Sequence, residues 1–203
     1  MTYRKLLPFE AGVLARHLLR LTASDRALRF MGALSDEAVG THARRMDWRR
    51  TVVIGFFDAG ILRGAAEIHA ADLRPPIVFE GAFTVETAWQ DQGVGTELLR
   101  RALLISRNRV AGALRISCFS DNLRIQHIGH KFGAAFRSAC GEAEADIALP
   151  PPNWWSLTGE AVDDGVGLAL SWCDRLGAVL RPTLARIAPL RPGPLADPRV
   201  LAD

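Results

Sequence analysis

The spacing of apolar positions along the chain separates extended segments from helical ones. Runs rich in β-branched and aromatic residues predict strands at residues 3–7, 51–57, 61–69, 77–85, 114–118, 134–138 and 144–149. Apolar residues that recur every three or four positions predict helices over residues 9–21, 35–46, 93–108 and 123–131. The polar residues 22–25 predict a break, so we expect two helices between the first strand and the main sheet.

The order of these segments constrains how the strands pair. The turn residues Asp58, Ala59 and Gly60 lie between two extended runs and predict a β-hairpin. The apolar residues of 77–85 do not alternate, which is typical of a strand buried on both faces, so we expect this strand near the centre of the sheet. The strand, helix and strand within residues 77–118 predict a crossover unit, the connection that joins parallel strands.

Three consecutive prolines mark a change in the chain after residue 149. Pro150, Pro151 and Pro152 form a stiff spacer that cannot continue a central strand. One apolar stripe then predicts a helix over residues 161–180, formed by Val166, Leu170, Cys173, Leu176, Val179 and Leu180. Beyond Pro182 the tail is rich in proline, arginine and alanine, and we expect it to be loosely ordered. The chain is therefore expected to hold one domain at 1–149 and an extension at 150–203.

Composition places the protein among ordinary globular chains. Its 203 residues are 49% hydrophobic and 23% charged, which excludes disordered, collagenous and small disulfide-framework classes. The net charge is only +3 and no basic run is present, so we expect no nucleic-acid partner. No segment could cross a bilayer without burying charge, and no apolar signal core follows the N-terminus, so we expect no membrane partner. Three widely spaced cysteines favour a reduced, cytoplasmic protein.

The stretch from Val85 to Leu99 carries the strongest chemical signal, because a buried strand ends there and a helix begins at Gly93 and Gly95. A helix start presents unpaired N–H groups and about half a positive charge, so it can hold a phosphate group. Glycine lets a bulky pyrophosphate approach the backbone, although close packing of the helix would also explain the two glycines. The stretch has neither the Lys-Ser/Thr of a P-loop nor a six-residue Gly-x-Gly-x-x-Gly motif, so both common nucleotide-binding motifs are excluded.

The same stretch resembles the acetyl-CoA pyrophosphate loop of the GNAT superfamily of N-acetyltransferases. The family pattern is a valine, a few residues, then Arg or Gln-x-x-Gly-x-Gly/Ala, and it is matched by Val85, Gln90, Gly93 and Gly95. A second family segment, Asn…Lys-x-Gly-Phe, is similar to residues 121–133, and the likeness covers residues 3–149. The resemblance implies an α/β (α+β) fold with a mixed, mostly antiparallel sheet flanked by helices, to which this chain adds a C-terminal helical extension.

The resemblance also implies which residues bind acetyl-CoA, the expected co-substrate. Backbone groups of Phe83, Thr84 and Val85 would pair with the pantetheine arm, and Asn122 would contact the cofactor near its sulfur. The pyrophosphate would be wrapped by Gln90, Asp91, Gln92, Gly93, Val94, Gly95 and Thr96. Two glutamines stand where the family commonly has cations, and Asp91 stands where glycine is common. Its carboxylate should repel a pyrophosphate unless it points outward.

Acetyl transfer to an amine requires the amine to be neutral, although a lysine-like amine has a pKa near 10.4. Glu80 occupies the strand position at which several family members carry a carboxylate, and Glu67 on the preceding strand could face the same cleft. Either could relay the proton through water, and for each the alternative is an ion pair with an arginine. A bulge at Gly81 would expose a backbone N–H to the thioester oxygen.

The general acid of many family members is missing from this chain. The family commonly places a tyrosine seven residues after the asparagine, and here that position is Gly129, while Tyr3 is the only tyrosine. A coenzyme thiolate can still leave with help from a helix end or from water. His127 and His130 could hold a metal, but no third ligand has a supporting spacing, so we expect no metal site.

The sequence therefore predicts transfer of acetyl from acetyl-CoA to a primary amine by direct attack, the amine being a small molecule or a protein lysine. Residues 21–31 resemble bacterial protein-lysine acetyltransferase domains. The alternative is a non-catalytic acyl-CoA-binding regulatory module, because the tyrosine is missing. The apolar stripe of the C-terminal helix could form a homodimer. Trp154 and Trp155 either cap the acceptor cleft or anchor that helix on the core.

Overall fold

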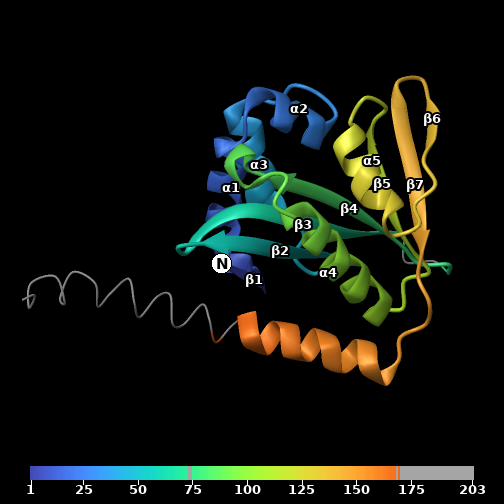
Figure 1. Cartoon of the computed structure of the whole chain (residues 1–203). Coiled ribbons are helices and arrows are strands. Elements are labelled where there is room, and N and C mark those ends of the chain that lie inside the picture. The colour runs from blue at the N-terminus through green and yellow to red at the C-terminus, as the bar shows by residue number, and fades with distance from the viewer. Residues whose placement is uncertain (73–74, 168, 170–203) are drawn as a thin grey trace, which may run out of the picture.

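The computed structural model describes residues 1–72, 75–167 and 169, and it contains a seven-stranded sheet in the order β1-β2-β3-β4-β5-β7-β6 (Figure 1). The strands are β1 (Thr2–Lys5), β2 (Thr51–Asp58), β3 (Ile61–Asp72), β4 (Val78–Val85), β5 (Ala113–Phe119), β6 (Arg137–Ala139) and β7 (Glu142–Ala148). The helices are α1 (Ala11–Arg20), α2 (Ala23–Phe30), α3 (Asp36–Arg45), α4 (Val94–Asn108) and α5 (Leu123–His130), with 3-10 turns η1 (Pro8–Glu10) and η2 (Thr87–Trp89). Every neighbouring pair of strands is antiparallel except β4 and β5, so the sheet is mixed and mostly antiparallel, as the resemblance implied.

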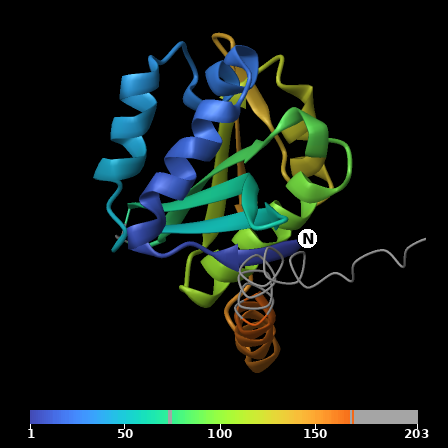
Figure 2. The ribbon, with the colours of Figure 1, turned by 90° about the vertical axis from the view of Figure 1, so that its left-hand side faces the viewer.

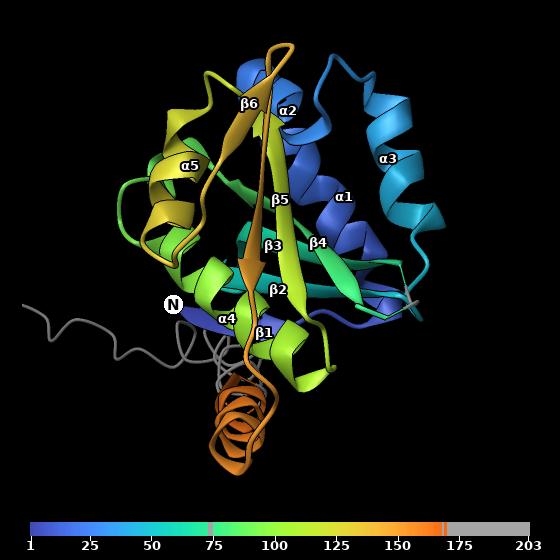
Figure 3. The ribbon, with the colours of Figure 1, turned by 90° about the vertical axis from the view of Figure 1, so that its right-hand side faces the viewer.

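Helices cover both faces of this sheet. Helices α1, α2 and α3 lie on one face, and α4 and α5 lie on the other (Figures 2 and 3). Because side chains alternate along a strand, β3 supplies both cores: Ala66 and Ile68 belong to the cluster that includes α4, and Ala65 belongs to the cluster that includes α1 and α3. The two apolar clusters hold the strands rigidly between two helical layers.

The predicted connections around the centre of the sheet are confirmed. The hairpin forms from β2 and β3 and turns at Ala59 and Gly60, whose φ angles of 48° and 76° lie in the left-handed region. Strand β4 is the middle strand, with three strands on either side. Helix α4 joins β4 to the parallel strand β5, which is the predicted crossover.

The chain does break after the first helix, because α1 ends at Arg20, but the break covers only residues 21–22 and the sequence missed helix α2, which begins at Ala23. The side-chain oxygen of Thr22 accepts a hydrogen bond from the backbone N–H of Asp25, so Thr22 caps the start of α2. Helix α2 is only eight residues long and has no fully buried residue, so its apolar pattern is short. Three α-helices, not two, precede the main sheet.

The helix of the C-terminal extension begins earlier than the sequence predicts. A helix spans 154–167, whereas the predicted helix starts at residue 161, and the remainder of that prediction and the tail lie outside the described residues. Asn153 begins it, because its side-chain oxygen accepts the backbone N–H of Ser156 at 2.8 Å. Within residues 1–72 and 75–167, the helices are too short or too polar to span a membrane.

Polar contacts, not tryptophans, fasten this helix to the core. Asp164 pairs with Lys5 of β1 at 2.6 Å, and Glu160 accepts a hydrogen bond from Asn108 of α4 at 2.7 Å. Trp154 and Trp155 are 73% and 81% exposed, and neither lines the large cleft described below. Both expectations for the tryptophans are therefore wrong, since they neither anchor the helix nor cap that cleft.

Strands β4 and β5 separate after a short parallel contact. Pairing is limited to Val78–Glu80 of β4 and Ala113–Arg115 of β5, so beyond Glu80 the two strands diverge. The predicted bulge at Gly81 is wrong, because Gly81 pairs with Ile68 in a continuous register and the irregularity between β3 and β4 lies between Ala70 and Asp72. The divergence leaves the β5-facing backbone groups of β4 without a strand partner, available to an extended ligand.

Candidate functional site

A cleft of about 560 Å³ opens where β4 and β5 diverge. Its walls come from the ends of these strands, from α2 on one side, and from the loop before α4 together with α5 on the other (Figure 1). The predicted site residues that line it are Phe83, Thr84, Val85, Gln90, Asp91, Gly93, Gly95, Thr96 and Asn122. Gln92 and Val94 lie outside the lining, since Gln92 donates to the carbonyl of Ala88 at 2.8 Å and Val94 is buried in the core.

The N-terminus of α4 faces this cleft without a side-chain cap. Gly93 precedes the helix with φ of 81°, and the first backbone bond of the helix runs from the N–H of Glu97 to the carbonyl of Gly93. The N–H groups of the first turn therefore have no helical acceptor, and the helix dipole adds partial positive charge there. This end of the cleft is suited to an anionic group such as a phosphate.

Asp91 adopts a backbone conformation that favours glycine. Its φ of 58° lies in the left-handed region, which glycine tolerates freely and aspartate tolerates better than most other residues. Its side chain is 82% exposed, and a carboxylate oxygen lies 3.8 Å from Nε of Arg124. The carboxylate therefore points largely into solvent beside a cation, which reduces its repulsion of an anion in the cleft.

Helix α5 and its C-cap residue place two cations at the cleft, a role that the sequence did not indicate. Arg124 and Lys131 both line the cleft, and Nη1 of Arg124 donates to Oε1 of Gln90 at 2.7 Å. The amide of Gln90 also donates to the carbonyl of Val85 at 2.8 Å, so Gln90 ties the loop to both β4 and α5. Arg124 and Lys131 lie outside the loop, so the loop's own sequence gives no sign that α5 brings positive charge to it.

The remaining cofactor candidates lie along the diverging strands and at the start of α5. Phe83, Thr84 and Val85 line the cleft opposite Ile116 and Cys118 of β5. Asn122 is the N-cap of α5, and its Oδ1 accepts the backbone N–H of Ile125 at 3.4 Å. The proposed contacts of these residues with a cofactor stay predictions.

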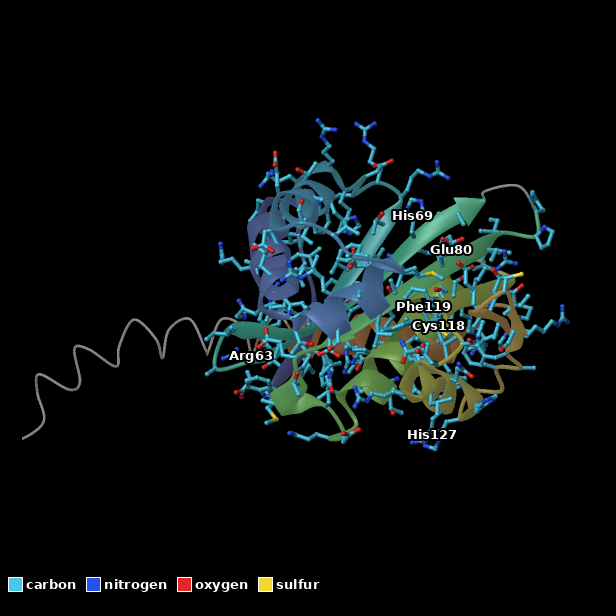
Figure 4. All side chains as sticks on the ribbon, turned by 90° about the horizontal axis from the view of Figure 1, so that it is seen from above. Arg63, His69, Glu80, Cys118, Phe119 and His127 are labelled. Carbon is cyan, nitrogen blue, oxygen red and sulfur yellow. The ribbon has the colours of Figure 1, made fainter. Side chains whose placement is uncertain are left out.

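Glu80 lies at the vertex of the divergence, as the last residue of β4 that pairs with β5. Its register partners are Arg115 on β5 and His69 on β3, and its side chain is exposed (Figure 4). Within the described residues it makes no hydrogen bond and no ion pair within 4 Å, and its charge acts on the neighbouring Arg115. His69, a neighbour that the sequence did not single out, lies within hydrogen-bond distance of Thr51, with Nδ1 3.1 Å from Oγ1.

Glu67 is buried, and its carboxylate contacts the side chains of Arg29 and His42. One carboxylate oxygen accepts from Nη2 of Arg29 at 2.8 Å, and the other lies 2.7 Å from Nε2 of His42. Burial alone would raise the pKa of Glu67, but Arg29 and His42 outweigh it and lower the pKa to about 2. A carboxylate with this pKa is a weak base, and neither Glu67 nor Glu80 belongs to the cleft lining itself. The structure forms the ion pair with an arginine that the sequence offered as the alternative.

A second buried carboxylate fixes the end of β4. Glu86 accepts hydrogen bonds from Arg20 and Arg63, each at 2.8 Å, and lies 3.1 Å from Nδ1 of His17. The other nitrogen of His17 lies 2.9 Å from the hydroxyl of Thr84, a cleft residue. Burial would raise the pKa of Glu86, but these hydrogen bonds lower it to about 2. The network ties α1 to the strand end that forms the cleft wall.

The structure offers no tyrosine to the cleft. Gly129, at the family's tyrosine position, packs so closely that an added Cβ would lie 2.8 Å from the ring of Phe136. Tyr3 lies on β1 beside Phe56, and burial raises its pKa. His127 lines the cleft, whereas Nδ1 of His130 lies 2.8 Å from the carbonyl of Ala134. Across residues 1–72 and 75–167, no group of three potential metal ligands is close enough to hold an ion.

Comparisons with known proteins give one family and several similar folds. The model of the acetyltransferase (GNAT) family matches residues 14–134. The GNAT domain of S. lividans PAT superposes with a TM-score of 0.63 at 18% identity, covering 72% of this chain and 89% of that one. The putative acetyltransferase yncA from Salmonella typhimurium, solved with its cofactor acetyl-CoA, gives 0.58 at 14% identity, covering 75% and 96%. Ribosomal-protein-alanine N-acetyltransferase from Brucella melitensis gives 0.57 at 12%, covering 73% and 100%. No curated protein sequence matches the chain.

Proposed function

This chain belongs to the acetyltransferase (GNAT) family, and from that premise we propose that it transfers acetyl from acetyl-CoA to a primary amine by direct attack. The observation that carries the proposal is the geometry of the cleft, in which β4 and β5 diverge directly beside the uncapped N-terminus of α4. An unpaired strand edge suits the amide groups of a pantetheine arm, and the helix N-terminus suits a pyrophosphate. Both parts of acetyl-CoA thus have a fitting partner in one continuous cleft.

The proposed cofactor site combines backbone and side-chain contacts. Residues 83–85 would pair with the pantetheine arm, residues 90–96 would surround the pyrophosphate, and Asn122 would lie near the sulfur. Arg124 of α5 and Lys131 at the end of that helix would supply the positive charge that the loop itself lacks, since the cofactor carries several phosphate charges. We propose no metal in this reaction.

In the proposed reaction the neutral amine nitrogen attacks the thioester carbonyl carbon, the C–S bond breaks, and coenzyme A leaves as a thiolate that water protonates. The proton lost by the amine passes through water to Glu80. We assign this relay to Glu80 rather than Glu67, because Glu80 is exposed at the vertex while Arg29 and His42 engage Glu67. General-base assistance of this kind is commonly worth about 10²- to 10⁴-fold in rate.

The experiment that tests this function is a paired measurement on the wild type and Glu80→Gln. Calorimetry with acetyl-CoA should give equal affinities, because Glu80 lies outside the cleft lining. Thiol release with a panel of amines should fall by about 10²-fold or more in kcat. Glu142→Gln is the matched control, since Glu142 is an exposed glutamate on β7, and it should keep full turnover.

Two outcomes would contradict the assignment. Unchanged turnover in Glu80→Gln would remove Glu80 from the mechanism. Wild-type protein that binds acetyl-CoA but releases no thiol with any amine would instead favour the non-catalytic regulatory module.

We also propose that the exposed apolar side of helix 154–167 packs against a second copy of the chain. Trp155, Val162 and Val166 are 81%, 63% and 54% exposed, and at 100° per residue they fall on one stripe. The opposite side of the helix carries Glu160 and Asp164, which contact Lys5 of β1 and Asn108 of α4, so the apolar stripe faces away from the core. An exposed apolar stripe of this kind is typical of an interface.

Light scattering should therefore give twice the chain mass of 22.2 kDa. The double variant Trp155→Glu with Val162→Glu should give the monomer mass, because paired carboxylates on the stripe would have to be buried in the dimer. Ala161→Glu, on another side of the same helix, should stay dimeric. A wild-type monomer, or a double variant that remains dimeric, would rule out this interface.

The division of the chain and its location stay proposals as well. We propose that residues 1–149 form the catalytic domain, that residues 150–203 form an appended extension, and that the protein works in the cytoplasm. The unpaired thiols of Cys118 and Cys140 support a reducing environment.

A further inference from the structure

Arg29 places a positive charge in the cleft away from the end at which the cofactor's phosphates are proposed to bind. Arg124 of α5 and Lys131, the C-cap of that helix, lie on the same side as the N-terminus of α4. Arg29 lines the cleft from α2, which covers the ends of β4 and β5 from the opposite face of the sheet (Figure 3). A group bound by Arg29 is therefore separate from the phosphate end of the cleft.

The guanidinium of Arg29 is held in a fixed orientation. Its Nε and Nη2 both donate to Oε1 of Glu67, at 3.1 Å and 2.8 Å. Its central carbon lies 4.8 Å from the ring centroid of Phe30. Glu67 is only 5% exposed, and its other oxygen lies 2.7 Å from Nε2 of His42, so the carboxylate itself cannot rotate freely.

This arrangement is better explained by recognition than by stability. A buried ion pair contributes little net stability, because removing two charges from water offsets their attraction. The ion pair does, however, hold the planar guanidinium group of Arg29 in one orientation. Within the described residues, Nη1 of Arg29 makes no hydrogen bond, and an arginine with free, oriented donors is the side chain best suited to a carboxylate.

The distance to Glu80 limits the size of the molecule that could use both groups. Glu67 is the register partner of Ala82, and Glu80 lies two residues from Ala82 on the same face of β4. Such diagonal neighbours in an antiparallel pair are about 7–8 Å apart. An amine beside Glu80 and an anionic group beside Arg29 would therefore be only a few bonds from one another.

From this geometry we infer that the acetyl acceptor is a small molecule whose amine lies a few bonds from a carboxylate, as in an amino acid. Arg29 determines this specificity by binding the carboxylate, and Glu67 and His42 are positioning residues that hold it. The inference rests on the proposed function, since it names the class of acceptor for the same cleft. It places a protein lysine, whose amine is far from any carboxylate of its own, outside the preferred substrates.

The experiment compares free amino acids with their own amides at saturating acetyl-CoA, by following thiol release. Because a charge-assisted hydrogen bond contributes strongly, we expect kcat/KM to be about 10- to 100-fold higher for the acids. Arg29→Lys keeps the charge beside Glu67 but loses the fork, and it should raise KM for the acids while changing kcat little. Arg29→Gln should remove the preference altogether. Arg26→Gln, one turn earlier on α2 and outside the cleft lining, is the matched control and should keep it.

Calorimetry with acetyl-CoA separates failure of this inference from failure of the function. If all variants bind acetyl-CoA but amides or lysine peptides are acetylated as well as the acids, the inference is overturned and the proposed function stands. A preference for acids that survives in both Arg29 variants overturns it equally. If the wild type does not bind acetyl-CoA at all, the proposed function and the inference fall together.

Discussion

Replacing Gly95 with glutamate is expected to abolish measurable acetyl-CoA binding. Gly95 lies in the first turn of α4 and lines the cleft, and a Cβ added there would already lie 3.0 Å from the side chain of Ile128. A glutamate would fill the space before the free N–H groups and place a negative charge where the pyrophosphate is expected. Both effects act against the same ligand group, so calorimetry should show an affinity at least roughly 100-fold weaker.

The matched control for this prediction is Gly165→Glu. Gly165 lies on the exposed side of helix 154–167, and an added Cβ there meets nothing within 4 Å. The control introduces the same charge into the same protein, so it should bind acetyl-CoA as the wild type does. Equal affinity of Gly95→Glu and the wild type would show that the N-terminus of α4 does not hold the cofactor, and that its glycines serve close packing instead.

The free energy of unfolding is expected to fall in acid by more than protonation of the exposed carboxylates alone would cause. The pKa values of Glu67 and Glu86 are both lowered from 4.5 to about 2 in the folded state, because arginines and histidines surround them. A carboxyl group with a lowered folded pKa contributes stability above its unfolded pKa and loses it as the pH falls through the folded value. The loss should begin below about pH 5 and approach completion near pH 2, and it should total about 3 to 6 kcal/mol for the two groups.

Urea unfolding between pH 7 and pH 2.5 measures this loss directly. Glu67→Gln should be less stable at pH 7, because it leaves Arg29 without its carboxylate, and it should lose roughly half of the acid dependence. Glu142→Gln, a change at an exposed position on β7, should leave the acid dependence unchanged. A wild-type unfolding free energy that stays constant from pH 5 to pH 2.5 would show that neither carboxylate is stabilised by its partners.

The contrast between Asp91 and Arg124 shows how far the loop's own sequence can predict its chemistry. The loop alone predicts a weak phosphate site, because it has glutamines in place of cations and an added carboxylate. In the structure Asp91 points into solvent at a left-handed backbone position, and Arg124 reaches the loop from a helix more than thirty residues later in the chain. The charge at the cofactor end is therefore set by α5 as much as by the loop.

By itself the sequence determined the elements whose stability is local or whose pattern is periodic. Three features follow from the residues of their own segment. They are the apolar stripe of α4, the turn at Ala59 and Gly60, and the glycines at the start of α4. The family motif at Val85–Gly95 likewise needs only a strand end followed by a helix start. For the same reason the sequence missed α2, which has no buried residue, and misplaced the start of the helix at 154–167.

Only the tertiary structure decided which of two similar glutamates is available for chemistry. Glu67 and Glu80 both lie on central strands with their side chains on the same face, and the sequence treats them alike. Folding brings Arg29 and His42 onto Glu67 from two helices, while Glu80 is left exposed where β5 turns away. Pairing of this kind depends on contacts between residues 25 to 38 positions apart, and no local pattern encodes it, because ion pairs form wherever the packed helices bring opposite charges together.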